Sequence, residues 1–298
     1  MDSIELFAKK LCCVVLKNEP LMLHTSFKIG GAADLFLFVP SVFALKRILQ
    51  ELSRRDLNFF VIGCGTNLLV SDEGYRGVVI KLTGDFKKVK LIDGNRLECG
   101  SSVPLASACR EAQSMGLSGL EFAWGIPGSC GGAVYMNAGA YGKEISQVVQ
   151  SSVHVDATGK EFMVNAENLN FSYRKSFYTK KNLVITSVVF KLEKGDPKEI
   201  KQKMLEIILR RKKKQPLEFP SAGSVFKRPP GYYTGTLIQE CGLKGKRIGG
   251  ACVSEKHSGF IINVEKASCN DVLLLIDHIK KTVYKHSGVN LECEIRML

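Results

Sequence analysis

Residues 119–142 read GLEFAWGIPGSCGGAVYMNAGAYG, a stretch richer in glycine than a connecting segment requires. Glycines recur from Gly125 to Gly142 among small Ala and Ser residues, so few side chains cover the backbone. Pyrophosphates and flat ring systems need this exposure, because a Cβ atom would hold the ligand away from the backbone N–H groups. A glycine-rich structural crossover is the alternative interpretation of the same letters.

The first glycine loop along the chain lies in residues 61–80, VIGCGTNLLVSDEGYRGVVI, directly after a predicted strand. Leu68 occupies the position of the third glycine of the Rossmann fingerprint, and the chain contains no GxxxxGK[ST] phosphate loop. A Gly-x-Gly-Thr-Asn loop after a strand still exposes consecutive N–H groups that can bind a phosphate, although a tight turn explains the pattern equally well. Two such loops favour a dinucleotide bound by a fold other than the Rossmann fold.

The rest of the chain alternates predicted helices and strands. Apolar residues recur at helical spacing between capping signals in residues 41–55, 101–116 and 268–288. The runs NFFVIG, GVVIKL and residues 182–192 are typical of strands, and Asp196-Pro197 opens a further helix. The mixture indicates an α/β or α+β protein of more than one unit, with the main boundary near residue 195.

Composition limits the partners. Ten cysteines are scattered without a CxxC pair, and five histidines form no HxH or HExxH pair. We therefore expect free thiols in a reducing cytoplasm and no metal site. No apolar run approaches the roughly 20 residues of a membrane helix, so we expect no membrane partner.

The net charge of +13 is concentrated late in the chain. From Asp196 to the end, 19 Lys/Arg face 11 Asp/Glu. Such an excess suits an anionic partner, either nucleic acid or a phosphorylated small molecule. The densest run, RRKKK at 210–214, also suits a solvated helix C-terminus, and the aromatic signature of an RNA-recognition module is absent.

The stretch FPSAGSVFKRPPG, residues 219–231, places Ser224 shortly before two cations. Gly223 permits unusual backbone angles, and serine commonly bonds backbone groups in turns. Taken alone, the segment is more typical of a turn than of a catalytic loop.

Seven motifs occur in order from His24 to the C-terminus: HTSFKIGGAADLF, GCGTNLLV, GIPGSCGGAVYMNAGAYG, FSYRKSFY, SAGSVFKRP, GGACVSEKHSGFIIN and LECEIRML. Together they resemble the UDP-N-acetylenolpyruvoylglucosamine reductase family. The resemblance implies an α+β protein. It combines a p-cresol methylhydroxylase-type FAD-binding fold of two subdomains with a smaller C-terminal α+β substrate domain. We therefore expect an N-terminal helical segment at 1–21, an FAD-binding domain at 22–195 with two lobes split near 83, and a substrate domain at 196–298.

The resemblance also implies an activity. NADPH would reduce FAD, and flavin N5 would deliver hydride to the terminal enolpyruvyl carbon of UDP-N-acetylglucosamine enolpyruvate, giving UDP-N-acetylmuramate for peptidoglycan synthesis. The partner would be this UDP-sugar, with no nucleic acid and no membrane, and the enzyme would be a cytoplasmic monomer. Another flavin oxidoreductase of the same fold, or a basic nucleotide- or nucleic-acid-binding module, is the alternative.

Three residues match the family's catalytic positions. Arg174 in FSYR would hold the substrate carboxylate, a bidentate task for which lysine is poorly suited. Ser224 would protonate the enolate that follows hydride addition. Glu294 would sit on the other side of the carboxyl group and must carry a proton there, and Glu292 is its local competitor.

The resemblance also assigns binding residues. For FAD they are Gly63, Gly65, Thr66, Asn67, Gly128, Ser129, Gly131, Gly132 and Asn137. For the substrate they are Tyr173, Lys227, Arg228 and His257, although a structural role for His257 is nearly as well supported. The chain has no long insertion between Arg174 and Ser224, so it matches the shorter subclass without a mobile tyrosine flap.

Overall fold

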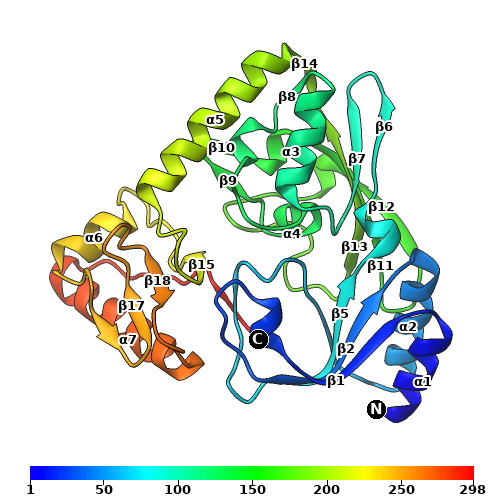
Figure 1. The fold of residues 1–298 in the computed structure, drawn as a ribbon, viewed down its shortest axis with the longest axis horizontal. Helices are drawn as coiled ribbons and strands as arrows, with labels where there is room; N and C mark the ends of the chain where they lie inside the picture. Colours follow the sequence, from blue (N-terminus) through cyan, green and yellow to red (C-terminus); the bar gives the residue numbers. More distant parts are fainter. The chain divides into compact units, whose positions relative to one another are not determined.

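The computed structural model describes residues 1–298 (Figure 1). The chain forms two units, and each unit is built from three separate stretches of sequence. Unit 1 contains residues 1–17, 34–64 and 77–210, and unit 2 contains 18–33, 65–76 and 211–298. The division at 210/211 falls later than the sequence boundary near 195. Two early segments, expected within the FAD-binding domain, belong instead to the unit built mainly from the C-terminal third.

The first lobe of unit 1 is a four-stranded sheet with two helices. Its strand order is β1-β2-β5-β3, with β3 parallel to β5. The bounds are β1 Val14–Pro20, β2 Ala32–Val39, β3 Phe59–Val61, β5 Tyr75–Leu82, α1 Asp2–Lys10 and α2 Val42–Arg54. Helix α2 begins as predicted, because the Ser41 hydroxyl accepts the N–H of Ala44 at 3.2 Å. Residues 1–21 were expected to be helical, but the helix ends at Lys10 and the chain continues as β1.

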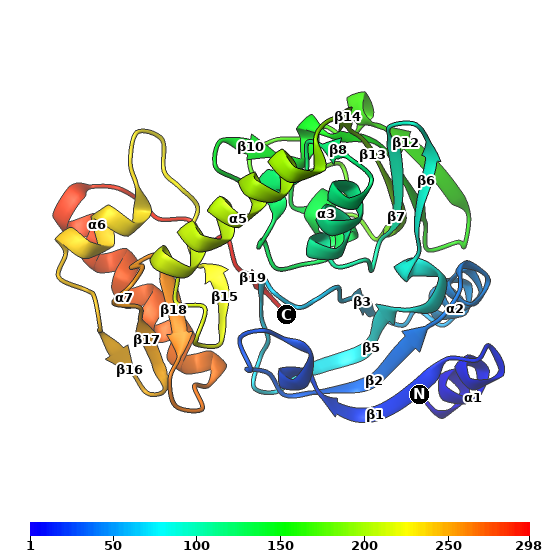
Figure 2. The ribbon, with the colours of Figure 1, turned by 45° about the horizontal axis from the view of Figure 1, so that its top comes forward.

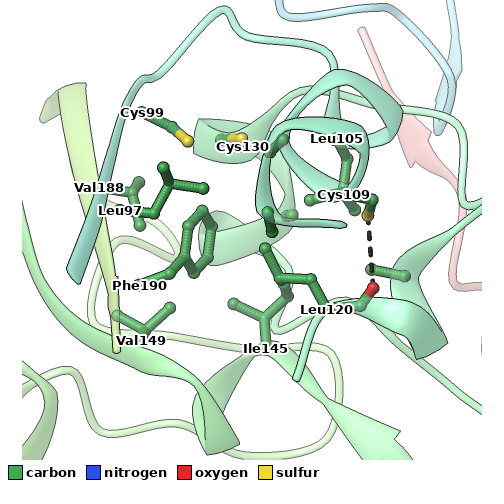
Figure 3. Close-up of a cluster of buried hydrophobic side chains, with 14 of the residues drawn as sticks. Leu97, Cys99, Leu105, Cys109, Leu120, Cys130, Ile145, Val149, Val188 and Phe190 are labelled. Atoms are coloured by element: carbon green, nitrogen blue, oxygen red, sulfur yellow. Dashed lines mark hydrogen bonds between the residues drawn. The ribbon is translucent and has the colours of Figure 1, made fainter. Parts of the chain in front are cut away.

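The second lobe of unit 1 is a five-stranded antiparallel sheet of order β12-β11-β13-β7-β6. Its strands are β6 Val89–Asp93, β7 Arg96–Gly100, β11 Val149–Val155, β12 Glu161–Asn165 and β13 Val184–Lys191. Two helices, α3 (Leu105–Ser114) and α4 (Cys130–Tyr135), share an apolar core with this sheet. Figure 3 shows that core, where the Cys109 thiol meets the Leu120 carbonyl oxygen at 3.3 Å.

Short elements complete unit 1. The small strands are β8 Leu117–Ser118 paired with β14 Glu193–Lys194, and β9 Gly139–Ala140 paired with β10 Lys143–Glu144. The 3-10 turns are η2 Gly84–Lys87, η3 Glu121–Ala123, η4 Ile145–Gln147 and η5 Ala166–Asn168. Helix α5, Pro197–Lys214, begins at the predicted proline and contains the point where the chain passes from unit 1 to unit 2.

Unit 2 is a four-stranded antiparallel sheet of order β15-β18-β17-β16 packed with two helices (Figure 2). The bounds are β15 Ser221–Ser224, β16 Arg247–Ile248, β17 Ala251–Val253, β18 Phe260–Asn263, α6 Thr234–Glu240 and α7 Cys269–Ser287. The turn η1, Leu21–His24, and the parallel pair β4 (Leu68–Leu69) and β19 (Arg296–Met297) complete it. Phe27, Ile29 and Leu69 are buried in its core, which explains why the early segments belong to this unit.

The structure bears on two predictions from the composition: the state of the cysteines and the absence of a membrane helix. All ten cysteines are free thiols, as the sequence predicted. No helix combines the length and the hydropathy that a membrane crossing requires.

Helix α7 shows why the local sequence predicts its ends so well. The Ser268 hydroxyl accepts the N–H of Asp271 at 3.0 Å, and the Asp271 carboxylate accepts the N–H of Ser268 at 3.0 Å. Gly288 ends the helix with φ +70, in the left-handed region that glycine adopts without a steric penalty. Both caps match the pattern in the sequence.

We expect Ser268→Ala to lower the free energy of unfolding by about 1 kcal/mol, because the N–H of Asp271 loses its acceptor. Denaturant titration followed by circular dichroism measures this change. Ser53→Ala is the matched control, since Ser53 is exposed on α2 and its side chain makes no hydrogen bond; its effect should stay within about 0.5 kcal/mol. Equal losses in both variants would contradict the capping role.

Candidate active site

The loop after β3 presents backbone donors. The N–H groups of Gly63, Cys64 and Gly65 have no acceptor within the protein. Gly65 has φ +64, and a Cβ atom there would collide with the carbonyl oxygen of His24. Only glycine therefore fits this position, and the three adjacent N–H groups can bind a phosphate.

The second glycine loop is built differently. The N–H of Gly131 donates to the Ser101 carbonyl oxygen at 2.8 Å, and the N–H of Gly132 donates to the Ser129 hydroxyl at 3.2 Å. A Cβ atom on Gly131 would come within 2.8 Å of the Ser101 Cβ, so the backbone packs closely here. This loop can let a ligand approach closely, but these two donors are already engaged.

Within unit 1, Gly63 lies beside the second glycine loop. A Cβ atom on Gly63 would lie 2.8 Å from the Ser129 hydroxyl oxygen, although the two residues are far apart in the sequence. A donor-rich loop beside a loop of small residues fits the pyrophosphate and ring system of a flavin dinucleotide. Asn67 and Thr66 follow directly, and the Asn67 amide nitrogen donates to the Glu294 carbonyl oxygen at 3.2 Å.

Asn137 holds together three segments. Its side chain is buried, at 1% exposure, and its backbone is left-handed with φ +44. The amide nitrogen donates to a Glu144 carboxylate oxygen at 2.8 Å and to the Ser172 carbonyl oxygen at 3.1 Å, while its oxygen accepts the N–H of Ser146 at 3.0 Å. Both amide hydrogens thus have protein acceptors, so the structure gives Asn137 an internal role. Its contact with FAD stays a prediction.

Arg174 occupies the tip of a two-residue turn. Ser172 and Lys175 exchange backbone hydrogen bonds of 3.1 Å in both directions, and Tyr173 and Arg174 lie between them. Arg174 has φ +57, a conformation that costs a residue with a Cβ about 1–2 kcal/mol. The turn and its hydrogen bonds therefore hold the backbone of Arg174 in a strained but defined conformation.

Three groups surround the Arg174 guanidinium. Nη2 donates to the Gly139 carbonyl oxygen at 3.3 Å, Nη1 lies 3.9 Å from the Glu144 carboxylate, and Cζ lies 4.7 Å from the centre of the Tyr173 ring. The Arg174 side chain is only 17% exposed. The sequence does not single out Glu144, because one glutamate after a glycine-rich turn carries no recognisable pattern.

Ser224 lies at the end of β15, next to the segment that carries Glu294. Gly223 precedes it with φ +76, and a bulge separates the two pairings of β15 with β18, at Ser221 and at Ser224. The Ser224 hydroxyl donates to the Phe226 carbonyl oxygen at 3.3 Å. The N–H of Glu294 donates to the carbonyl oxygen of Val225 at 2.7 Å. Unit 2 therefore brings these two predicted catalytic residues onto adjacent, paired segments.

The structure distinguishes the two candidate glutamates. Glu292 is 74% exposed and forms an ion pair of 2.8 Å with Lys227. Glu294 is less exposed, and its backbone oxygen accepts from Asn67 in the first glycine loop. The catalytic role of the Glu294 carboxyl group stays a prediction.

The other predicted substrate residues have neighbours of their own. The guanidinium of Arg228 lies 3.8 Å from the centre of the Tyr233 ring, and its Nε donates to the Tyr232 carbonyl oxygen at 3.2 Å. The His257 ring packs edge-on against Phe260, and its Nδ1 accepts the N–H of Gly259 at 3.1 Å. A Cβ atom on Gly259 would meet both His257 and the Ser224 hydroxyl, so all three lie together.

Comparison with known proteins identifies the family. A family model described as the C-terminal domain of UDP-N-acetylenolpyruvoylglucosamine reductase matches residues 215–298, and one described as an FAD binding domain matches residues 33–165. A UDP-N-acetylenolpyruvoylglucosamine reductase of Clostridium botulinum (strain Hall) is 46% identical over 286 residues, covering 95% of this chain and 92% of the relative. The chain belongs to this reductase family. A relative of the same description from Caldanaerobacter subterraneus is 47% identical over 94% of the chain and 92% of the relative.

Solved structures support the same fold. The crystal structure of the UDP-N-acetylenolpyruvylglucosamine reductase of Thermus caldophilus is similar, with a TM-score of 0.83 and 35% identity over 96% of this chain and 98% of that one. A BBE-like 1 variant of Physcomitrella patens shares the fold alone, with a TM-score of 0.50 and 15% identity over 64% of this chain and 44% of that one. The predicted fold class is thus confirmed, and so is FAD as the cofactor of an oxidoreductase of the UDP-N-acetylenolpyruvoylglucosamine reductase family.

We expect His257 to titrate below its usual range. Burial lowers the pKa of His257, and protonation of Nδ1 would also break the hydrogen bond from Gly259. The unfolded chain, with a histidine pKa of about 6.5, then binds the proton first, so this residue destabilises the fold progressively as the pH falls below that value. Nitrogen-detected NMR titration, with the signal assigned through His257→Gln, measures the midpoint. A midpoint at or above about 6.5 would contradict the assignment.

Proposed function

We propose that the protein catalyses the NADPH-dependent reduction of UDP-N-acetylglucosamine enolpyruvate to UDP-N-acetylmuramate, a step of peptidoglycan precursor synthesis in the cytoplasm. The names of its relatives support the reaction. The observation that carries the proposal is the pairing of the segment bearing Ser224 with the segment bearing Glu294. The reaction needs a proton donor for the enolate carbon and an acid for the adjoining carboxyl group.

The two glycine loops are the proposed FAD site. The N–H groups of Gly63 and Gly65, with Thr66 and Asn67, would bind the pyrophosphate. Gly128, Ser129, Gly131 and Gly132 would form the wall against which the cofactor lies, because they lack large side chains. When bound, FAD supplies the hydride, obtained from NADPH and delivered to the terminal carbon of the enolpyruvyl group.

Arg174 would bind the substrate carboxylate. Hydride addition places negative charge on the neighbouring carbon and on the conjugated carboxylate, so a fixed guanidinium stabilises the transition state more than the ground state. The turn at Ser172–Lys175 supports this role, since it fixes the backbone from which the guanidinium extends.

Ser224 would then protonate the enolate carbon. Its hydroxyl donates only to the Phe226 carbonyl oxygen at 3.3 Å, a long hydrogen bond that a substrate atom can replace. Glu294 would act in its protonated form on the carboxyl group of the substrate, since an ionised carboxylate would repel the enolate.

Four residues would complete the substrate site. Lys227 and Arg228 would contact the diphosphate or its ribose flank, as expected of cations beside an anionic ligand. Tyr173 and His257 would contact the sugar or the carboxyl group. In this proposal Lys227 exchanges its pairing with exposed Glu292 for the phosphate, which costs little because that ion pair is partly solvated.

The reaction has a direct test. We expect the purified flavoprotein to oxidise NADPH rapidly only when UDP-N-acetylglucosamine enolpyruvate is added, with UDP-N-acetylmuramate as the product seen by mass spectrometry. UDP-N-acetylglucosamine, which lacks the double bond, is the control compound. Turnover that is the same with either compound would exclude the proposed substrate.

Ser224→Ala separates the two half-reactions. We expect NADPH to reduce the bound flavin at the wild-type rate, and the substrate to reoxidise it roughly 10²–10⁴-fold more slowly, because the proton donor is lost. Anaerobic stopped-flow absorbance measures both steps. Ser287→Ala is the matched control, since that hydroxyl also donates to a backbone oxygen of unit 2, at 2.9 Å from Val283 O. Equal slowing of both half-reactions would assign Ser224 a structural role.

A further inference from the structure

Glu144 is an acidic residue beside the Arg174 guanidinium. Its two carboxylate oxygens face different partners: one lies 3.9 Å from Nη1 of Arg174, and the other accepts from the Asn137 amide at 2.8 Å. The second contact is the shorter one, and it comes from a buried side chain. The carboxylate is therefore fixed from the protein side and presents its remaining oxygen to the arginine.

The hairpin that carries Glu144 contacts the guanidinium twice. Glu144 pairs with Gly139 in the short ladder between β10 and β9, and the Gly139 carbonyl oxygen accepts from Nη2 of Arg174 at 3.3 Å. A Cβ atom at position 139 would come within 2.8 Å of the Glu144 Cγ, so glycine lets the glutamate side chain lie against its own hairpin. The Gly139 carbonyl oxygen and the Glu144 carboxylate thus contact two different nitrogen atoms of the planar Arg174 guanidinium.

Asn137 links this hairpin to the turn that carries the arginine. The same amide nitrogen that donates to Glu144 also donates to the Ser172 carbonyl oxygen at 3.1 Å, at the base of the Arg174 turn. A single buried amide therefore fixes both the backbone of the turn and the carboxylate beside its tip. Movement of Glu144 relative to Arg174 would disturb a satisfied, buried hydrogen-bond network.

We propose that Glu144 is a positioning residue for Arg174: it orients the guanidinium so that its other N–H donors face the substrate carboxylate. This inference rests on the proposed function for its kinetic consequence, but the geometry of the pair can be tested without substrate. A guanidinium has five N–H donors, so it can serve Glu144 and a second carboxylate together. The shared arginine charge also keeps Glu144 from repelling that carboxylate at full strength.

The first experiment measures the arginine directly. Nitrogen-15 NMR of the Arg174 side chain, assigned through Arg174→Lys, reports rotation about the Cζ–Nη bonds in the FAD-loaded protein without substrate. We expect Glu144→Gln to shift the Arg174 signals and to speed this rotation. Glu161→Gln is the matched control, because Glu161 belongs to the same unit, pairs with Lys46 at 2.9 Å and has a similar side-chain exposure, 42% against 35% for Glu144. Unchanged Arg174 signals in Glu144→Gln would overturn the proposal.

The second experiment is a double-mutant cycle on flavin reoxidation by UDP-N-acetylglucosamine enolpyruvate. We expect Glu144→Gln to slow this half-reaction roughly ten- to a hundred-fold in the wild-type background, because a misplaced Arg174 guanidinium no longer aligns the substrate carboxylate. In the Arg174→Lys background the same change should cost no more than about two-fold, since its effect passes through the arginine. Reduction by NADPH is measured in every variant as well, so that a loss confined to reoxidation can be told from a general loss of flavin function.

The outcomes separate the two claims. Additive effects in the cycle would overturn the positioning role even if the protein has the proposed activity. If the wild-type protein does not turn over this substrate, the proposed function fails, and the NMR comparison alone decides whether Glu144 orients Arg174. Equal melting temperatures of Glu144→Gln and Glu161→Gln exclude general unfolding as the cause.

Discussion

The backbone hydrogen bonds of the last residues of the chain hold two distant segments of unit 2 together. On one side Glu294 donates its N–H to Val225, and on the other Arg296 donates its N–H to the carbonyl oxygen of Asn67. The strand β19 then runs parallel to β4. A single extended segment thus ties the serine loop to the first glycine loop, so the register of the C-terminus sets where two groups of predicted site residues lie relative to each other within this unit.

The two glycine loops show that similar sequences can do different work. In the first loop the N–H groups of Gly63, Cys64 and Gly65 have no protein acceptor, whereas in the second loop the N–H groups of Gly131 and Gly132 donate to protein oxygens. The first loop therefore offers hydrogen-bond donors to a ligand, whereas the second lets a ligand approach its backbone closely. The sequence predicted both loops but could not separate these roles, because the difference depends on acceptors such as Ser101 that are distant in the chain.

Local signals in the sequence predicted the fold well where both partners were close together. The caps of α2 and α7 involve residues three or four positions apart, so their spacing is visible in the letters. The exchange of residues 18–33 and 65–76 into unit 2 was not predicted, because an apolar pattern shows that a side chain is buried but not against what. The same limit hid the pairing of Lys227 with Glu292 and the approach of Glu144 to Arg174.

The composition of the unit 2 core has a consequence for synthesis. Phe27 and Ile29 leave the ribosome early, yet the side chains that bury them extend to Ile295. Nearly the whole polypeptide must therefore emerge before this core can close, whereas the sheet and helices of the second lobe of unit 1 are complete by Lys191. Nascent chains would expose those early apolar side chains for most of translation, which makes them candidates for chaperone contact.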